Sequence, residues 1–217
     1  MGDIDISCAL QPGQDTHVDS VEVLPASTTT TVAVQSSPIA YGASPSLTAE
    51  VAQTGSSAKP GGTVAFSLDG TTVTAPVQAG KAKVDLPPAF AIGVRTVTAT
   101  FTPDAKNLVP SQASAFLTVV RDTTTTRAKA VYRDARDRLV GRARVDAAHG
   151  AAVAGVVRLV LKRDGVRIRA ARVPLNAYGT AKKVFKNLTQ QGRYTVVTRY
   201  LGSTTFRRSA DRARLTV

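Results

Sequence analysis

The residues of this chain that could perform chemistry are few and far apart. Its two histidines, His17 and His149, lie in unrelated regions, and neither has a ligand partner at metal-binding spacing, so both are expected at the surface. No sequence of the G-x-S-x-G, H-E-x-x-H, G-x-G-x-x-G or Walker type occurs. Because an enzyme needs converging acids, bases, nucleophiles or metal ligands, we predict a non-enzymatic protein without catalytic, cofactor-binding or metal-binding residues.

Two further features of the sequence could contribute a metal ligand or a disulfide, but neither is complete. Asp104 and Asn107 could offer oxygen ligands to Ca²⁺, but two ligands fall far short of the usual six to eight, so we expect turn capping instead. Cys8 is the only cysteine, so no disulfide can form within the chain. Either its partner lies outside this chain or Cys8 is a buried small residue, and the sequence leaves both alternatives open.

Basic side chains are the one chemically active group that the sequence concentrates. The chain has 28 Lys and Arg against 15 Asp and Glu, a formal net charge of +13, and residues 1–120 carry −4 whereas residues 121–217 carry +17. Such a density of cations favours phosphate or carboxylate polymers. The outward-pointing positions that we predict as a polyanion-binding surface are Arg142, Arg144, Arg158, Lys162, Arg167, Arg169, Lys182, Lys183, Arg193, Arg199, Arg207, Arg208 and Arg212.

This basic half has three interpretations. It is a solvated surface that keeps the protein soluble, with GC-rich coding contributing to the arginine content, or it binds an anionic cell-wall polymer, or it binds nucleic acid. Recognition of single strands usually adds aromatic side chains that stack on bases. The chain has no Trp and only 5% aromatic residues, which places nucleic acid last among the three.

The elements that must position these residues recur along the chain. A Thr run, a strand that ends in Asp-Gly, a long Thr-rich strand and a final strand follow one another twice, at spacings of 93–99 residues. The paired segments are STTTT (27–31) and DTTTT (122–126), GGTVAFSLDG (61–70) and AGVVRLVLKRDG (154–165), GVRTVTATF (93–101) and GRYTVVTRY (192–200), and SAFLTV (114–119) and RARLTV (212–217). Landmarks in the same order indicate two copies of one domain.

Within each copy the apolar residues alternate with a period of two. Val, Phe or Leu occupies every second position at residues 64, 66 and 68 in the first copy and at 157, 159 and 161 in the second, as in strands with one buried face. Asp69-Gly70 and Asp164-Gly165 follow these strands, and both residue types tolerate the positive φ of a tight hairpin. The pattern predicts an all-β fold of two tandem immunoglobulin-like antiparallel β-sandwiches.

These motifs resemble the bacterial Ig-like repeat domains of secreted and cell-surface proteins. The resemblance rests on TTTTVAV (28–34), YGASPSLTAEV (41–51), GGTVAFSLDGTTV (61–73) and VRTVTATFTPDAKNLVPSQASAFLTV (94–119), and it is looser in the second copy. The family's Y-x-G-D-x-x-Y loop is altered, with Phe101 and Pro103 in the first copy; the second keeps Tyr200, Gly202 and Phe206 but lacks the Asp. These departures weaken any function that the loop would share across the family.

The resemblance divides the chain into three parts. Residues 27–120 and 122–217 are predicted as two Ig-like domains, the second one basic. Residues 1–26 resemble the last hairpin of an upstream secreted domain of unknown function plus a linker; an ordered leader strand plus linker is the alternative. Because Arg121-Asp122 is too short for a flexible spacer, we expect an extended, end-to-end pair with limited bending.

The function that the resemblance implies is a non-catalytic extracellular structural or adhesive module, the stalk or spacer of a bacterial surface or secreted protein. The alternative is a binding module whose basic second domain attaches to anionic cell-wall polymers. Expected partners are such a polymer or another surface protein, and we expect a monomer. No segment approaches the ~18 consecutive apolar residues of a membrane span, and residues 1–10 lack the features of a signal peptide. Because Ile4, Ile6, Cys8 and Leu10 alternate with mostly polar residues, like a strand already under way, we expect a fragment of a longer secreted protein whose signal lies upstream, without membrane insertion.

Overall fold

The described part of the chain is built from strands. The computed structural model describes residues 24–88, 90–133 and 137–217, and these contain no helix, hence none that could cross a membrane. The hairpin predicted within residues 1–26 lies outside the described residues, apart from Leu24 to Ala26, as do Cys8 and His17. The all-β prediction is confirmed.

The first eight strands form the sandwich that we call the N-terminal sandwich. They are β1 (Thr28–Val34), β2 (Ile39–Ala40), β3 (Ser46–Gln53), β4 (Gly62–Leu68), β5 (Thr71–Pro76), β6 (Lys81–Asp85), β7 (Gly93–Pro103) and β8 (Ser111–Val120). One sheet has the order β1-β3-β6 and the other β2-β8-β7-β4-β5. All pairs are antiparallel except that of β2 with β8, in which Ile39 faces Val119.

The remaining strands form the C-terminal sandwich. They are β9 (Thr124–Arg133), β10 (Arg138–Ala147), β11 (Val156–Arg163), β12 (Val166–Pro174), β13 (Thr180–Phe185), β14 (Arg193–Tyr200) and β15 (Ser209–Thr216). They pair antiparallel in sheets of order β13-β10-β9 and β12-β11-β14-β15. The strand order β5-β4-β7-β8 therefore recurs as β12-β11-β14-β15, as two tandem immunoglobulin-like sandwiches require.

Each sandwich encloses its own apolar core. The side chains of Val64, Phe66 and Leu68 on β4 are at most 1% exposed, and those at residues 157, 159 and 161 on β11 are fully buried, which confirms the predicted alternation. The hydroxyl of the buried Tyr194 donates to Gln190 O (2.6 Å), so its polar tip is satisfied inside the apolar core.

The Asp-Gly pairs make the predicted hairpin turns. Asp69 and Asp164 both have a φ of 47°, and Gly70 and Gly165 follow with φ values of 83° and 86°. Residues with positive φ at both central positions match the right-handed twist of the flanking strands. The repeated Asp-Gly thus fixes the register of β4 with β5 and of β11 with β12.

The repeated Thr runs link the first strand of each sandwich to the last strand of the same sandwich, which belongs to the opposite sheet. Thr28 and Thr30 both bond to the Ser111 hydroxyl, at 2.8 and 2.7 Å. Thr124 and Thr126 bond to Ser209 in the same way, at 2.7 and 2.6 Å. The polar runs therefore close one edge of each sandwich with hydroxyl pairs, which explains why the same letters occur twice.

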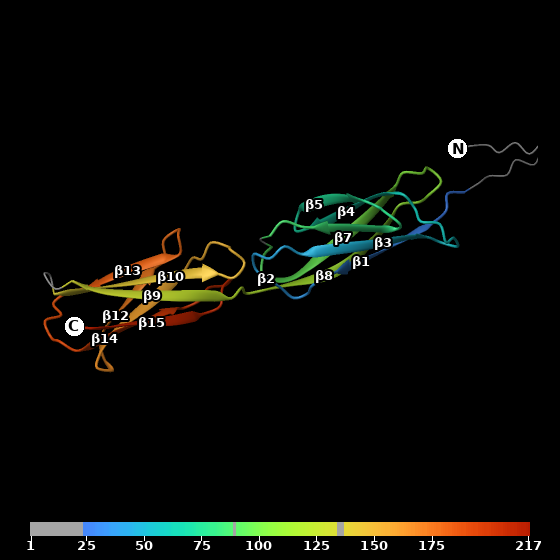
Figure 1. The fold of residues 1–217 in the computed structure, drawn as a ribbon. Helices are drawn as coiled ribbons and strands as arrows, with labels where there is room; N and C mark the ends of the chain where they lie inside the picture. The colour runs from blue at the N-terminus through green and yellow to red at the C-terminus, as the bar shows by residue number, and fades with distance from the viewer. Residues whose placement is uncertain (1–23, 89, 134–136) are drawn as a thin grey trace, which may run out of the picture.

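The two sandwiches lie end to end (Figure 1). The start of β1 and the end of β15 lie at opposite ends of the elongated molecule, and β2 lies at the end of the N-terminal sandwich that faces the C-terminal sandwich. This arrangement agrees with the expected extended pair. The exact domain limits, residues 27–120 and 122–217, remain a prediction.

Candidate functional site

Asp122 is completely buried where the two sandwiches meet. Its backbone N–H donates to Thr205 O (3.0 Å), and its carbonyl oxygen accepts from Arg207 N (2.8 Å). Its carboxylate accepts from Thr123 N (2.7 Å), from His149 N (3.1 Å) and from His149 Nδ1 (2.8 Å). Asp122 is therefore held by backbone and side chain together, and the short connection between the sandwiches is part of the fold.

His149 lies at the surface, as expected, but its ring also makes a specific contact. Its side chain is 44% exposed, yet Nδ1 contacts the buried carboxylate of Asp122. A carboxylate oxygen only accepts hydrogen bonds, so Nδ1 carries a proton in this contact. The exposed loop after β10 is thereby fixed to the connection between the sandwiches.

Tyr41 belongs to the N-terminal sandwich and contacts the C-terminal sandwich. It follows β2, its backbone N–H donates to Val120 O (2.8 Å), and its ring packs on the core of the C-terminal sandwich. The ring meets that of Phe206 edge to face, with centroids 5.6 Å apart. At the next residue, Gly42 (φ 89°), an added Cβ would lie 3.2 Å from the Cβ of Ala151. The chain thus crosses the junction in close contact.

The start of the N-terminal sandwich lacks these groups. The parallel bridge between Asp122 and Phe206 corresponds there to a bridge between Ala26 and Leu108. The loop after β3 is the equivalent of the loop after β10, and it has Gly55 at the position of His149. The carboxylate, imidazole and aromatic ring are therefore specific to this junction and are no general feature of the repeat.

A first basic surface covers the outer side of the three-stranded sheet of the C-terminal sandwich; we call it the β10 face. Lys129 and Lys182 are the direct cross-strand partners of Arg142, so the three cations form one row across the sheet. In the next row Arg144 pairs with Asp146 (2.8 Å). Like charges directly opposite each other destabilise a sheet. The cations that line the open groove of about 660 Å³ on this side are Arg127, Lys129, Arg142, Arg144 and Lys182.

A second basic surface covers the outer side of the four-stranded sheet; we call it the β14 face. Arg158 has Arg172 and Arg199 as its direct cross-strand partners. The outward basic positions of this face are Arg158, Lys162, Arg167, Arg172, Arg199, Arg212 and Arg214. Every outward position of these four strands is described, and none is acidic.

The structure distributes the predicted basic residues over several places. Arg142, Arg144 and Lys182 lie on the β10 face, and Arg158, Lys162, Arg167, Arg199 and Arg212 lie on the β14 face, with Arg193 at its end. Arg169 and Lys183 share an open cavity between β12 and β13, and Arg207 and Arg208 precede β15 near the junction. Sequence reasoning missed four members of the two faces, although their strand alternation could have revealed them: Arg127, Lys129, Arg172 and Arg214.

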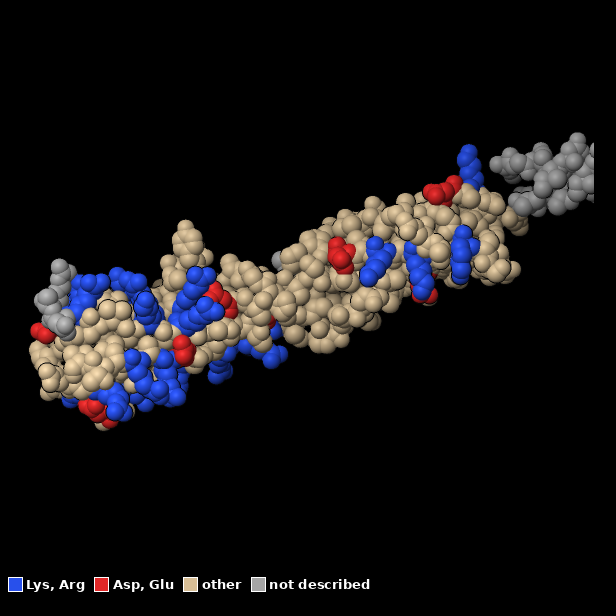
Figure 2. Space-filling view, in the orientation of Figure 1, with Lys and Arg blue, Asp and Glu red and all other residues tan. Residues whose placement is uncertain are grey.

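The basic faces are absent from the equivalent sheets of the N-terminal sandwich. Space-filling atoms of Lys and Arg crowd the C-terminal sandwich, whereas the visible side of the N-terminal sandwich is mostly uncharged (Figure 2). On the β14 face, the residues Arg158, Arg172, Arg199, Arg212 and Arg214 stand where the N-terminal sandwich has Ala65, Thr74, Thr100, Ser114 and Phe116, respectively. One fold thus presents an uncharged and a strongly cationic version of the same surface.

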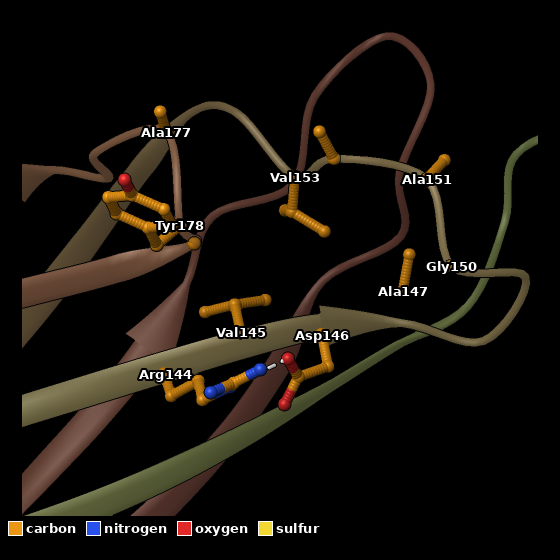
Figure 3. A pocket seen from close by; sticks show the side chains of 11 residues that line it. Arg144, Val145, Asp146, Ala147, Gly150, Ala151, Val153, Ala177 and Tyr178 are labelled. Carbon is orange, nitrogen blue, oxygen red and sulfur yellow. Dashed lines mark hydrogen bonds and ion pairs between the residues drawn. The ribbon is translucent and has the colours of Figure 1, made fainter.

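A smaller cavity of about 410 Å³ lies at the end of β10. The Tyr178 ring lies above Val145, and the dashed line joins Arg144 to Asp146 (Figure 3). The only cation and the only carboxylate that line this cavity, Arg144 and Asp146, form an ion pair with each other. The cavity therefore offers no unpaired acid or base to a bound molecule. Nor do the described residues hold three or more His, Cys, Asp or Glu in a metal-binding group. The absence of catalysis stays a prediction.

Asp211 makes a link across one edge of the C-terminal sandwich. The backbone N–H of Ala128 on β9 donates to its Oδ2 (2.8 Å). Hydrogen bonds from Ala128 and from the backbone of Arg212 lower the pKa of Asp211 below its ordinary value. The charged form of this carboxylate therefore joins β15 to the neighbouring sheet.

Known proteins match parts of this chain. The model of the family described as bacterial Ig-like domain (group 3) matches residues 28–120. No curated protein matches the chain significantly in sequence.

Among solved structures, a tetra-tandem repeat in the extending region of a large adhesion protein is 18% identical, with a TM-score of 0.47, over 92% of this chain and 51% of that one. The fibronectin(III)-like modules of Clostridium thermocellum CbhA are 16% identical, with a TM-score of 0.32, over 86% of this chain and 94% of theirs. Trypsin-activated alpha-2-macroglobulin from Escherichia coli is 12% identical, with a TM-score of 0.36, over 91% of this chain and 16% of that one. This chain thus spans about half the length of the adhesion-protein repeat.

Proposed function

Because residues 28–120 belong to the bacterial Ig-like domain family (group 3), we propose that the chain is a spacer, a stalk segment that holds other parts of a bacterial surface or secreted protein apart. The observation that carries the proposal is the junction, where the Tyr41 ring beside β2 packs on the core of the C-terminal sandwich and the buried Asp122 is hydrogen-bonded to that same sandwich. A spacer must resist bending between its units. Here bending would separate groups that are paired inside the molecule.

The energetics of the junction support this role. Bending would separate the Tyr41 ring from Phe206 and from the apolar core of the C-terminal sandwich. An aromatic pair contributes about 0.5–1.5 kcal/mol beyond its buried area, and the hydrophobic effect of burying the ring adds to this. The sum exceeds the thermal energy, which favours one relative orientation of the two sandwiches.

Small-angle X-ray scattering of the full chain tests the proposal. A spacer gives an elongated particle whose maximum dimension does not change with salt concentration. The double variant Tyr41→Ala/Asp122→Ala should give a broader distribution of distances, since it removes both contacts. Val131→Ala, an exposed position near the end of β9 that makes none of these contacts, is the control and should leave the scattering unchanged. A compact particle for the natural chain would overturn the proposal.

A second candidate function is attachment of the C-terminal sandwich to anionic cell-wall polymers. The observation that favours it is the like-charged row of Arg172, Arg158 and Arg199, none of which forms an ion pair with an acidic side chain of the described residues. Sedimentation of the full chain with purified bacterial cell walls tests it. Binding should fall steeply and log-linearly with salt because cation–phosphate contacts release counterions. No sedimentation at about 50 mM salt, where surface electrostatics are strongest, would exclude this function and leave the spacer proposal intact.

A further inference from the structure

The β14 face has a specific pattern of charge. Its first row across the sheet is cationic, with Arg158 between two arginines. The next row along the strands consists of Ala170, Val160 and Val197 and ends with Arg212. The third row contains the direct partners Arg167 and Lys162 and ends with Arg214. Cationic rows thus flank a small apolar strip.

This pattern lowers the stability of the sheet. Direct cross-strand partners have their Cβ atoms about 4.5–5.5 Å apart, and like charges at that distance repel each other. The N-terminal sandwich, which folds with the same strand order, has Thr74 and Thr100 beside Ala65 at these positions and avoids the repulsion. An anionic ligand that lies on the row would relieve it, because each of its phosphates could accept from two neighbouring guanidinium groups.

The spacing of the rows indicates the kind of polymer. The two cationic rows are four residues apart along β11, which corresponds to about 13 Å of strand. A polymer lying along the strands would meet cations, then an uncharged strip lined by Val160 and Val197, and then cations again. A polycarboxylate with a charge on every ring would place several charges over the apolar strip. A chain in which uncharged polyol or sugar units separate the phosphodiesters places fewer charges there and fits the pattern better.

The same face disfavours nucleic acid. Its outward strand positions carry Arg, Lys, Val, Ala, Thr and Pro, and none of them is aromatic. Single-strand binding proteins stack bases on aromatic side chains. A phosphodiester chain without bases needs only the cations and the small apolar strip.

We propose that the β14 face binds a linear phosphodiester polymer of polyol or sugar units laid along its strands, with Arg172, Arg158 and Arg199 holding one phosphate group. This inference rests on the second function proposed above and assigns that function to one face and one chemical class of polymer. The β10 face, whose groove also contains Asn176 and the ion-paired Arg144, serves as the internal comparison.

Binding of fluorescently labelled poly(glycerol phosphate) to the full chain tests the inference. The triple variant R158Q/R172Q/R199Q removes one row of the β14 face, and K129Q/R142Q/K182Q removes the matching row of the β10 face with the same loss of charge. We expect the first variant to weaken binding at least about tenfold and to reduce the log–log salt slope by about 0.7, the value for one lost phosphate contact. The second should weaken binding less than about threefold, through its reduced net charge alone.

Thermal unfolding of the same proteins separates lost binding from lost folding. Both triple variants remove like-charge repulsion and should unfold at or above the temperature of the natural chain. Equal weakening by the two variants would overturn the assignment to the β14 face. Equally tight binding of polygalacturonate, of single-stranded DNA or of phosphatidylglycerol vesicles would overturn the class of polymer. Absence of binding would overturn the whole inference, while the scattering experiment would still decide the spacer proposal.

Discussion

The carboxylate of Asp122 bonds to both the backbone N–H and the ring of His149, 27 positions further along the chain. One residue belongs to the connection between the sandwiches and the other to the loop after β10. The pair thus joins the connection to the body of the C-terminal sandwich. With Asp122 tied to this sandwich, Arg121 alone separates the end of β8 from it, and this short connection supports the spacer proposal.

Replacing Asp122 by Ala should destabilise the C-terminal sandwich. The substitution leaves three N–H donors without their acceptor, and we expect the free energy of unfolding to fall by about 1–3 kcal/mol. Chemical denaturation followed by circular dichroism measures this change. Asp211→Ala is the control, because that carboxylate also accepts a backbone N–H, that of Ala128 (2.8 Å), but is exposed on a strand. An equal loss in both variants would show that burial at the junction contributes nothing special.

The contact of Tyr41 with Phe206 should couple the stabilities of the two sandwiches. Tyr41→Ala, a change beside β2, should lower the unfolding temperature of the C-terminal sandwich because its core loses a packed ring. A double-mutant cycle with Phe206→Ala should give a coupling energy of about 0.5–1.5 kcal/mol. Calorimetry of the four proteins measures it, and additive effects would mean that the rings do not interact in solution.

Thr198 is a site where a substitution should raise stability. Its side chain is fully buried, and its hydroxyl has no hydrogen-bond partner among the described residues. The equivalent position of the N-terminal sandwich is Ala99, which is also buried. Thr198→Val keeps the shape and removes the unsatisfied hydroxyl, so unfolding should require about 1 kcal/mol more. Lower stability of the variant would reveal a partner for the hydroxyl.

The carboxylate of Asp211 should make stability depend on acidic pH. Its pKa is lowered in the folded state from an ordinary value of 3.8 by the Ala128 N–H, so its stabilising effect is present above 3.8 and is lost as pH falls through the folded value. The stability difference between the natural chain and Asp211→Asn should therefore be present near neutral pH and shrink below about pH 4. Urea denaturation across this pH range tests the sign, and a difference that grows on acidification would contradict it.

Local sequence signals predicted much of the fold. Alternation along residues 64–68 and the Asp-Gly turns each depend on neighbouring residues, which the sequence displays directly. The junction was not predicted, because Asp122 in an exposed-looking connection becomes buried only when segments near residues 41, 149 and 206 meet there. Such a meeting leaves no periodic signal in the chain.

The basic faces were predicted in part, for a similar reason. Strand alternation shows which way Arg158 points, but only the strand order shows that Arg172 and Arg199 are its direct neighbours. The repulsive row, which motivates the polymer-binding inference, is a property of register between strands. Register depends on the whole sheet and could not be read from one strand.

The distance between the far ends of the molecule tests the central claim most directly. Spin labels would be attached to Thr29→Cys on β1 and Thr216→Cys on β15 of a chain that also carries Cys8→Ser, so that no other thiol reacts. Pulsed electron paramagnetic resonance would then measure the distribution of label separations. The spacer account predicts a single, long and narrow distribution that becomes broader with Tyr41→Ala/Asp122→Ala. A broad distribution or a short separation in the otherwise natural chain would contradict it.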